Sequence, residues 1–151
     1  MEPVIEIEGL RKDFRVGFWR RRIQVLHSLD LAVQRGEIFG YLGPNGAGKT
    51  TTLKLLTGLI LPTAGSARLL GRDLTDVAAK QHIGFLPENP YFYDYLTGRE
   101  FLDFCGRLFG LSASDRRDRI ARLLRLIEME EAAHLQLRKY SKGMLQRLGL
   151  A

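Results

Sequence analysis

The chain has 151 residues, 45% of them hydrophobic, which suits one folded domain and argues against intrinsic disorder. Its formal net charge of +6 suits an anionic ligand, a nucleic acid or an acidic membrane surface and does not choose among them. The single cysteine, Cys105, excludes an internal disulfide and fits a reducing compartment, and no stretch approaches the roughly 20 apolar residues of a membrane-spanning helix.

The first part of the chain has the patterning of a strand-rich fold. Apolar and polar residues alternate over 4–7, and a second strand-like stretch lies within 23–33. Between them, the charged stretch 15–22 contains Gly17 and predicts a hairpin. We therefore expect two strands joined by a charged turn.

An apolar run, a glycine-rich loop and a helix follow in that order. Residues 38–42 form a short apolar run after the turn at Gly36, which is typical of a buried strand. A helix is predicted over 49–59, with three leucines facing a core: Leu53, Leu55 and Leu56. Beyond it we expect a strand, a partly helical stretch and another strand, over 67–70, 76–81 and 83–86.

The next part of the chain is predicted to be helical. Thr97 and Glu100 have the spacing of a capping box, in which the hydroxyl and the carboxylate satisfy free amides at a helix start. This helix should run to Gly110, a typical C-terminal stop. A second helix is predicted over 114–128, with an apolar face made of Ile120, Leu123, Leu124 and Ile127. A third, short helix is predicted over 130–137.

Residues 43–50 carry the chemistry of this sequence. They match the pattern G-x-x-x-x-G-K-[ST] in full: Gly43, Pro44, Asn45, Gly46, Ala47, Gly48, Lys49 and Thr50. Glycines let consecutive amides turn inward as an anion-binding nest, and the helix that follows directs the positive end of its dipole at the same anion. Lys49 supplies a point charge toward the β- and γ-phosphates, and the Thr50 hydroxyl is a ligand for Mg²⁺. The motif predicts a site for a nucleoside triphosphate, namely ATP with Mg²⁺.

The stretch from Gly36 through this loop to Thr51 resembles the nucleotide-binding subunits of ABC transporters, and the resemblance runs through nearly the whole chain. Among these subunits, the chain looks most like those paired with ABC-2 type exporter membrane subunits. The resemblance implies an α/β fold: a P-loop NTPase core with an N-terminal antiparallel β-subdomain and a helical subdomain insert, the C-terminal part of the core being missing. It also adds Thr51 to the nucleotide-binding residues.

Two further site residues are implied by the resemblance. The family stacks an aromatic ring on adenine from a loop near its N-terminus, and the segment Leu-Arg-Lys-Asp-Phe, which ends at Phe14, looks like that loop. Phe18 and Trp19 lie close by as rival candidates for this contact. The family also has a glutamine that touches Mg²⁺ and the attacking water. Glu88 stands at that position here, and its carboxylate still offers an oxygen to the metal.

The segment 140–147, Tyr-Ser-Lys-Gly-Met-Leu-Gln-Arg, looks like the family signature, which is normally Leu-Ser-Gly-Gly-Gln. Ser141 and Gly143 are retained. Three positions depart from the commonest form: Tyr140, Lys142 and Met144. A hydroxyl and a close-approach glycine at a helix N-terminus make a phosphate site. In the family this site acts in trans, on ATP held by a partner subunit, so the resemblance assigns Ser141 and Gly143 to that role.

The resemblance also divides the chain. It implies an incomplete ABC-type ATP-binding domain over 1–151, with a core of 1–96 and 140–151 and a helical subdomain of 97–139 that docks on the membrane partner. In the family, an Asp for Mg²⁺ and a Glu that acts as the general base follow the signature, and a switch histidine lies further on. His27, His82 and His134 all precede the signature. We therefore expect the front part of a longer protein, inactive as an ATPase by itself.

The leading hypothesis is an energy-coupling ATPase subunit of a membrane exporter, peripheral at the cytoplasmic face of the membrane. Two such subunits, identical or different, would hold two ATP molecules between them and drive an integral membrane transporter subunit. Catalysis would rest on positioning and charge stabilisation, with Lys49 and Glu88 in catalytic roles. The transported substrate is not readable, because specificity would lie in the membrane subunit.

Three alternatives stay open. A soluble ABC-type ATPase acting on nucleic acid or ribosomes fits the basic charge, but the chain shows neither a second nucleotide loop nor a long coiled-coil arm, and we expect no nucleic-acid partner. A small-molecule kinase explains Lys49 and leaves 140–147 unexplained. A nucleotide-binding module without turnover is the non-enzymatic reading. The arginine runs at 20–22 and 116–125 are expected to be solvated.

Overall fold

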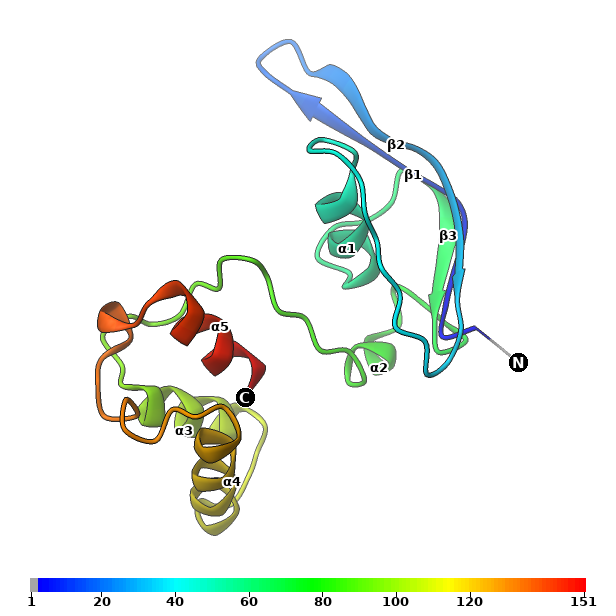
Figure 1. Cartoon of the computed structure of the whole chain (residues 1–151). Helices are drawn as coiled ribbons and strands as arrows, with labels where there is room; N and C mark the ends of the chain where they lie inside the picture. Colours follow the sequence, from blue (N-terminus) through cyan, green and yellow to red (C-terminus); the bar gives the residue numbers. More distant parts are fainter. Residues whose placement is uncertain (1–2) are drawn as a thin grey trace. The chain divides into compact units, whose positions relative to one another are not determined.

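The computed structural model describes residues 3–151 and has two compact units, Met1–Gly84 and Phe85–Ala151 (Figure 1). In the described part of the chain, the first unit contains the strands β1 to β4 with helices α1 and α2, and the second contains α3, α4, a 3-10 helix η1 and α5. Each unit has a hydrophobic core of its own. No helix among residues 3–151 is long and apolar enough to cross a membrane.

An antiparallel sheet of four strands, in the order β2-β1-β3-β4, forms the first unit. Its strands are β1 (Ile5–Val16), β2 (Arg21–Val33), β3 (Ala64–Leu69) and β4 (Arg72–Asp73). β1 lies between two neighbours, so that Ile5 pairs with Val33 on one side and with Leu69 on the other. The strands predicted over 4–7, 23–33 and 67–70 are confirmed. The predicted hairpin is confirmed as the turn between β1 and β2.

Helix α1 (Lys49–Leu56) packs on this sheet through Leu55, which is fully buried. The prediction that Leu53 faces the core is wrong, because residues two apart lie about 200° apart around a helix and Leu53 is therefore turned toward solvent. The helix ends three residues earlier than predicted, at Thr57 and the left-handed Gly58. The predicted helical stretch over 76–81 is confirmed as α2 (Val77–Lys80), capped by Asp76.

Two predicted strands are wrong. Residues 38–42 and 83–86 are not in strands, and neither stretch pairs with another strand among residues 3–151. The side chains of Ile38 and Leu42 are almost completely exposed. An apolar run favours a buried strand only where a neighbouring strand completes its backbone hydrogen bonds, and the described chain supplies none here.

The second unit is helical. Its elements are α3 (Gly98–Leu108), α4 (Ala113–Leu126), η1 (Leu137–Lys139) and α5 (Lys142–Leu150). The predicted capping box is confirmed: Glu100 N donates to the Thr97 hydroxyl at 3.2 Å, and Thr97 N donates to the Glu100 carboxylate at 2.8 Å. The second predicted helix is confirmed as α4, which buries Ile120 and Leu124. These residues share a core with Leu102, Ile127, Met129, Ala133, Leu137, Tyr140 and Leu148.

The helix predicted over 130–137 is wrong, since this stretch forms turns followed by η1. Its carbonyl groups serve the start of α3 instead of an internal helix ladder. Gly98 N donates to the Leu135 carbonyl at 3.3 Å, and Arg99 N donates to the Ala133 carbonyl at 3.0 Å. Gln136 also forms an isolated bridge with Thr97. The amides of Leu137 and Arg138 donate to the Leu96 and Asp94 carbonyls, at 2.8 and 3.0 Å, so they are not available to the carbonyls four residues earlier, as a helix would require.

Candidate nucleotide-binding site

The loop 43–48 has the backbone geometry of an anion nest. Gly46 and Gly48 have φ angles of 84° and 89°, in the left-handed region that glycine adopts without strain. Gly48 caps α1 without a side-chain hydrogen bond, and the first helical bond runs from Thr52 N to the Gly48 carbonyl at 2.8 Å. The amides of 49–51 therefore have no intrahelical acceptor and remain available to an anion.

Lys49 lies folded over this loop. Its Nζ donates to the carbonyl oxygens of Gly43 at 2.6 Å and Pro44 at 2.8 Å. These are neutral acceptors, so a triphosphate would offer the ammonium group a stronger, charge-assisted partner at the same place. Thr50 is exposed in the first turn of α1. No group of three or more His, Cys, Asp or Glu side chains that could hold a metal exists among residues 3–151.

Thr52 stabilises the loop 43–48 through a buried hydrogen bond, a role that was not identified from the sequence. Its side chain is only 1% exposed, and its hydroxyl donates to the Gly48 carbonyl at 3.1 Å. The Tyr41 hydroxyl lies 3.2 Å from the Thr52 hydroxyl oxygen. A threonine four residues after the last loop glycine, where its hydroxyl can reach back to that carbonyl, was the available signal.

Gly48 also packs directly on strand β2. A Cβ atom at this position would lie 3.2 Å from the Val25 carbonyl oxygen and 3.5 Å from a Leu26 methyl group. A side chain there would displace the loop from the sheet, in addition to the strain of its positive φ angle. The third glycine of the motif therefore joins the phosphate loop to the β1–β2 hairpin.

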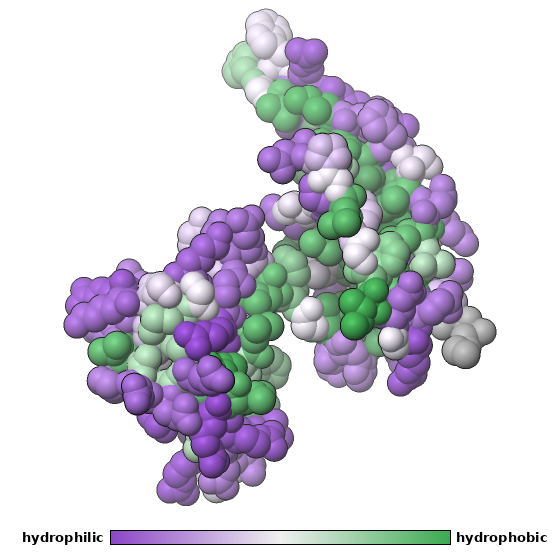
Figure 2. All heavy atoms as spheres, viewed as in Figure 1, coloured by the Kyte–Doolittle hydropathy of each residue, from purple (hydrophilic) through white to green (hydrophobic). Residues whose placement is uncertain are grey.

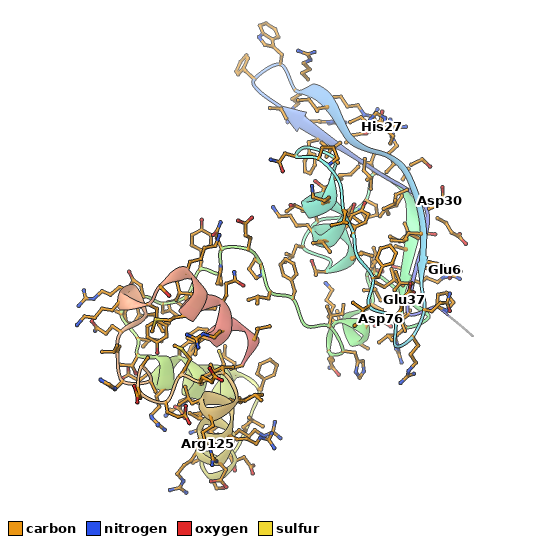
Figure 3. The ribbon with its side chains drawn as sticks, in the orientation of Figure 1. Glu6, His27, Asp30, Glu37, Asp76 and Arg125 are labelled. Carbon is orange, nitrogen blue, oxygen red and sulfur yellow. The ribbon has the colours of Figure 1, made fainter. Side chains whose placement is uncertain are left out.

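Phe14 lies on the face of this hairpin that carries the loop. It pairs with Ile23, and two residues earlier Lys12 pairs with Leu26, the residue that touches Gly48. The Lys12 ammonium lies 5.1 Å from the centre of the Phe14 ring, so both side chains share one face. Figure 3 shows the labelled His27, next to Leu26, on the opposite face. The rivals Phe18 and Trp19 lie beyond β1, in the turn.

Glu88, Ser141 and Gly143 belong to the second unit. The Glu88 carboxylate accepts from Lys142 Nζ at 3.2 Å, and Gln146 Nε2 donates to the carbonyl oxygens of Pro87 and Glu88. Segment 87–88 is therefore tied to the first turns of α5. Two residues that depart from the family pattern, a glutamate in place of glutamine and a lysine in the signature, contact each other.

The signature segment begins α5. Ser141 is the N-cap, and its hydroxyl accepts from Met144 N at 3.2 Å. Around Gly143 a Cβ would meet only the Ser141 hydroxyl, at 3.9 Å, so the packing of this unit does not require glycine there. Tyr140 is buried before the helix and donates to the Ala132 carbonyl at 2.7 Å, while burial raises the pKa of its hydroxyl. The open space at Gly143 suits the close approach of a ligand.

Comparison with known proteins connects these features. A sequence model for a family described as "ABC transporter" matches residues 26–151. An uncharacterised ABC transporter ATP-binding protein of Nostoc sp. is 51% identical over 98% of this chain and 45% of its own length. The Nod factor export ATP-binding protein I of Ralstonia nicotianae is 40% identical over 99% of this chain and 45% of its own length. A solved ATP-binding subunit of an ABC transporter superposes with a TM-score of 0.77 at 31% identity, over 97% of this chain and 60% of that one. The chain thus spans less than half the length of these two sequence relatives.

Proposed function

This chain belongs to the ABC transporter family, and from that premise we propose that the whole protein is an ATP-binding subunit that couples ATP binding and hydrolysis to export by a partner membrane subunit. The observation that carries the proposal is the loop 43–48. Two of its glycines have left-handed backbone dihedrals, and it leads into a helix that has no side-chain cap and begins with Lys49 and Thr50. The Nod factor export relative supports the direction of transport.

The phosphates of ATP bind at the N-terminus of α1. The free amides of 49–51 donate to phosphate oxygens, and the Lys49 ammonium moves from the carbonyls of Gly43 and Pro44 to the β- and γ-phosphates. Thr50 is the protein ligand of Mg²⁺, which neutralises charge on the phosphates when it is bound with ATP. Thr52 and Tyr41 keep the Gly48 turn in place while the ligand exchanges.

Phe14 binds the base, because it lies on the loop-bearing face of the hairpin within two residues of the Lys12–Leu26 pair. A ring face binds adenine by stacking, which needs no directional hydrogen bond.

Ser141 and Gly143 bind the γ-phosphate of ATP held by a second ATP-binding subunit. The N-terminus of α5 with a serine cap and an open glycine suits an anion that arrives from outside the chain. Glu88, held beside this helix by Lys142 and Gln146, is the candidate contact to Mg²⁺ and the attacking water.

The helical subdomain 97–139 docks on the membrane subunit, so the protein works as a peripheral component at the cytoplasmic face of the membrane. The alternative of a soluble ATPase acting on nucleic acid receives no support from the transporter relatives.

The test of the proposal is Lys49→Ala in the whole protein. We expect the loss of measurable ATP binding with an unchanged fold, because Lys49 is the cation that the loop holds at the phosphates. Isothermal titration calorimetry measures the affinity, and circular dichroism checks the fold.

Lys54→Ala is the matched control, since Lys54 is an exposed lysine in the last turn of the same helix. It should bind ATP as the wild type does. Equal ATP affinity for Lys49→Ala and Lys54→Ala would exclude the loop as the nucleotide site.

A further inference from the structure

The turn of the β1–β2 hairpin presents two bare aromatic rings. β1 ends at Val16 and β2 begins at Arg21, and Arg20 N donates to the Gly17 carbonyl at 3.1 Å to close the turn. Phe18 is 93% exposed and Trp19 is 89% exposed. Their rings contact only edge to face, with centroids 5.8 Å apart. Figure 1 shows this turn projecting beyond the rest of its unit.

Arginines surround this pair of rings. Four exposed arginines flank the turn: Arg15, Arg20, Arg21 and Arg22. No acidic residue occurs over 14–29. Among residues 3–151 only Arg22 of these four forms an ion pair, with Asp13 of β1. The other three guanidinium groups share the outer end with Phe18 and Trp19, and Figure 2 shows hydrophobic and weakly polar atoms beside strongly hydrophilic ones there.

These rings are not part of the nucleotide site described above. Phe18 and Trp19 lie in the turn beyond the end of β1, whereas Phe14 and Lys12 lie within the strand. The turn also does not require them, since neither ring is buried in the described chain. A surface that is both apolar and anionic would complement exposed aromatic rings among arginines.

We propose that this tip, residues 15–22, binds the surface of an anionic phospholipid bilayer. Tryptophan and phenylalanine have an affinity for the boundary between headgroups and acyl chains, where an apolar ring and a polar edge are both satisfied. The unpaired guanidinium groups then reach lipid phosphates, with which arginine forms two parallel hydrogen bonds. Charge complementarity favours a lipid surface over a second copy of this chain, whose net charge is also positive.

Trp19 supplies the readout, because it is the only tryptophan of the chain. The 151-residue chain is titrated, without nucleotide, with vesicles of pure phosphatidylcholine or of phosphatidylcholine containing about one third phosphatidylglycerol. We expect a saturable blue shift of Trp19 emission and co-sedimentation with the anionic vesicles only, both reversed by high salt. Since no nucleotide is present, failure here is distinguishable from failure of the ATP-binding proposal.

Two triple variants with the same change in net charge show whether vesicle binding depends on the arginines of the tip or on the positive charge of the whole chain. Arg15→Gln/Arg20→Gln/Arg21→Gln should weaken vesicle binding by about 100-fold, at roughly fivefold for each of the three arginines near the surface. The matched set Arg117→Gln/Arg119→Gln/Arg122→Gln, on exposed positions of α4, should bind like the wild type. Phe18→Ser should reduce both the blue shift and the binding.

Equal weakening by the two triple variants would overturn the proposal in favour of diffuse electrostatics. A blue shift that depends on protein concentration without vesicles would overturn it in favour of self-association. Equal binding to neutral and anionic vesicles, or no binding at all, would also overturn it. Because these side chains are exposed, circular dichroism should show the same fold for every variant.

Discussion

Phe14 is the residue whose role depends most on its neighbours. It shares the loop-bearing face of the hairpin with Lys12, so replacement by alanine removes a ring from beside the phosphate loop. In the whole protein we expect Phe14→Ala to weaken the binding of ATP by about 1–3 kcal/mol, the range for stacking of a base on an aromatic ring. The binding of inorganic triphosphate should weaken much less. Calorimetric titration with both ligands measures the difference.

Phe18→Ala is the control for that experiment, since it removes the same side chain from the exposed turn of the same hairpin. It should leave both affinities unchanged. Suppose that Phe18→Ala or Trp19→Ala weakened the binding of ATP more than that of inorganic triphosphate, and that Phe14→Ala did not. The adenine base would then stack on a ring of the turn and not on Phe14.

Lys142 forms an ion pair with Glu88, the proposed contact to Mg²⁺. The two side chains form an exposed ion pair at 3.2 Å, and such pairs contribute about 0.2–1 kcal/mol. If Glu88 contacts Mg²⁺ in the whole protein, Lys142→Ala frees the carboxylate. We expect the Mg²⁺ concentration for half-maximal ATPase activity to fall by about two- to fivefold.

The same substitution in a Glu88→Gln background shows whether the effect passes through the carboxylate. There, Lys142→Ala should change the Mg²⁺ dependence little. An equal fall in both backgrounds would mean that Lys142 acts directly on the nucleotide and that Glu88 is not a metal contact.

At the scale of the element, the carboxylate of Asp13 on β1 links the two strands of the hairpin through its ion pair with Arg22 on β2. The Asp13 side chain is almost fully covered and forms ion pairs with Arg11 and Arg22. Burial by itself raises the pKa of Asp13, but hydrogen bonds from both arginines and their positive charges outweigh this effect, so its pKa lies below the ordinary value. A carboxyl whose pKa is lowered by folding stabilises the folded state above its unfolded pKa, and this stabilisation disappears as the pH falls through the folded pKa.

Asp13→Asn therefore should lower the free energy of unfolding at neutral pH. The difference from wild type should be constant above about pH 5, shrink below about pH 4 and vanish in stronger acid. Urea unfolding at a series of pH values measures it, with the exposed Asp118→Asn on α4 expected to unfold like the wild type. A difference that stayed constant down to the lowest pH would assign the effect to lost packing.

On the scale of the whole molecule, each unit has a core of its own, so a substitution in one core should change hydrogen exchange in that unit and not in the other. Leu124 is almost completely buried in the core of the second unit, and none of its core partners comes from the sheet. We expect Leu124→Ala to cost about 2–5 kcal/mol, through lost burial and a residual cavity. Hydrogen exchange should accelerate across α3 and α4 while the amides of β1 and β3 keep their protection.

Leu126→Ala, two positions along the same helix and exposed, is the matched control and should change stability by less than about 0.5 kcal/mol. Equal acceleration of exchange in both units after Leu124→Ala would show that the cores unfold as one cooperative structure.

The sequence by itself determined the features whose signals are local. The glycines and lysine of 43–50 predicted a phosphate loop, and the loop has the left-handed dihedrals that only those glycines adopt cheaply. Thr97 with Glu100 predicted a capping box that is present, and alternation predicted the strands of the hairpin. Each of these depends on residues within a few positions of one another, so the information lies within a short stretch of chain.

Only the tertiary structure decided what depends on partners far along the chain. The apolar runs 38–42 and 83–86 did not become strands, because a strand also needs a neighbour to complete its hydrogen bonds. The helix predicted over 130–137 did not form, because the Leu137 and Arg138 amides donate to the Leu96 and Asp94 carbonyls, some forty positions earlier in the chain. The Thr52–Tyr41 support and the Glu88–Lys142 pair are likewise contacts across sequence distance, which residue patterns do not encode.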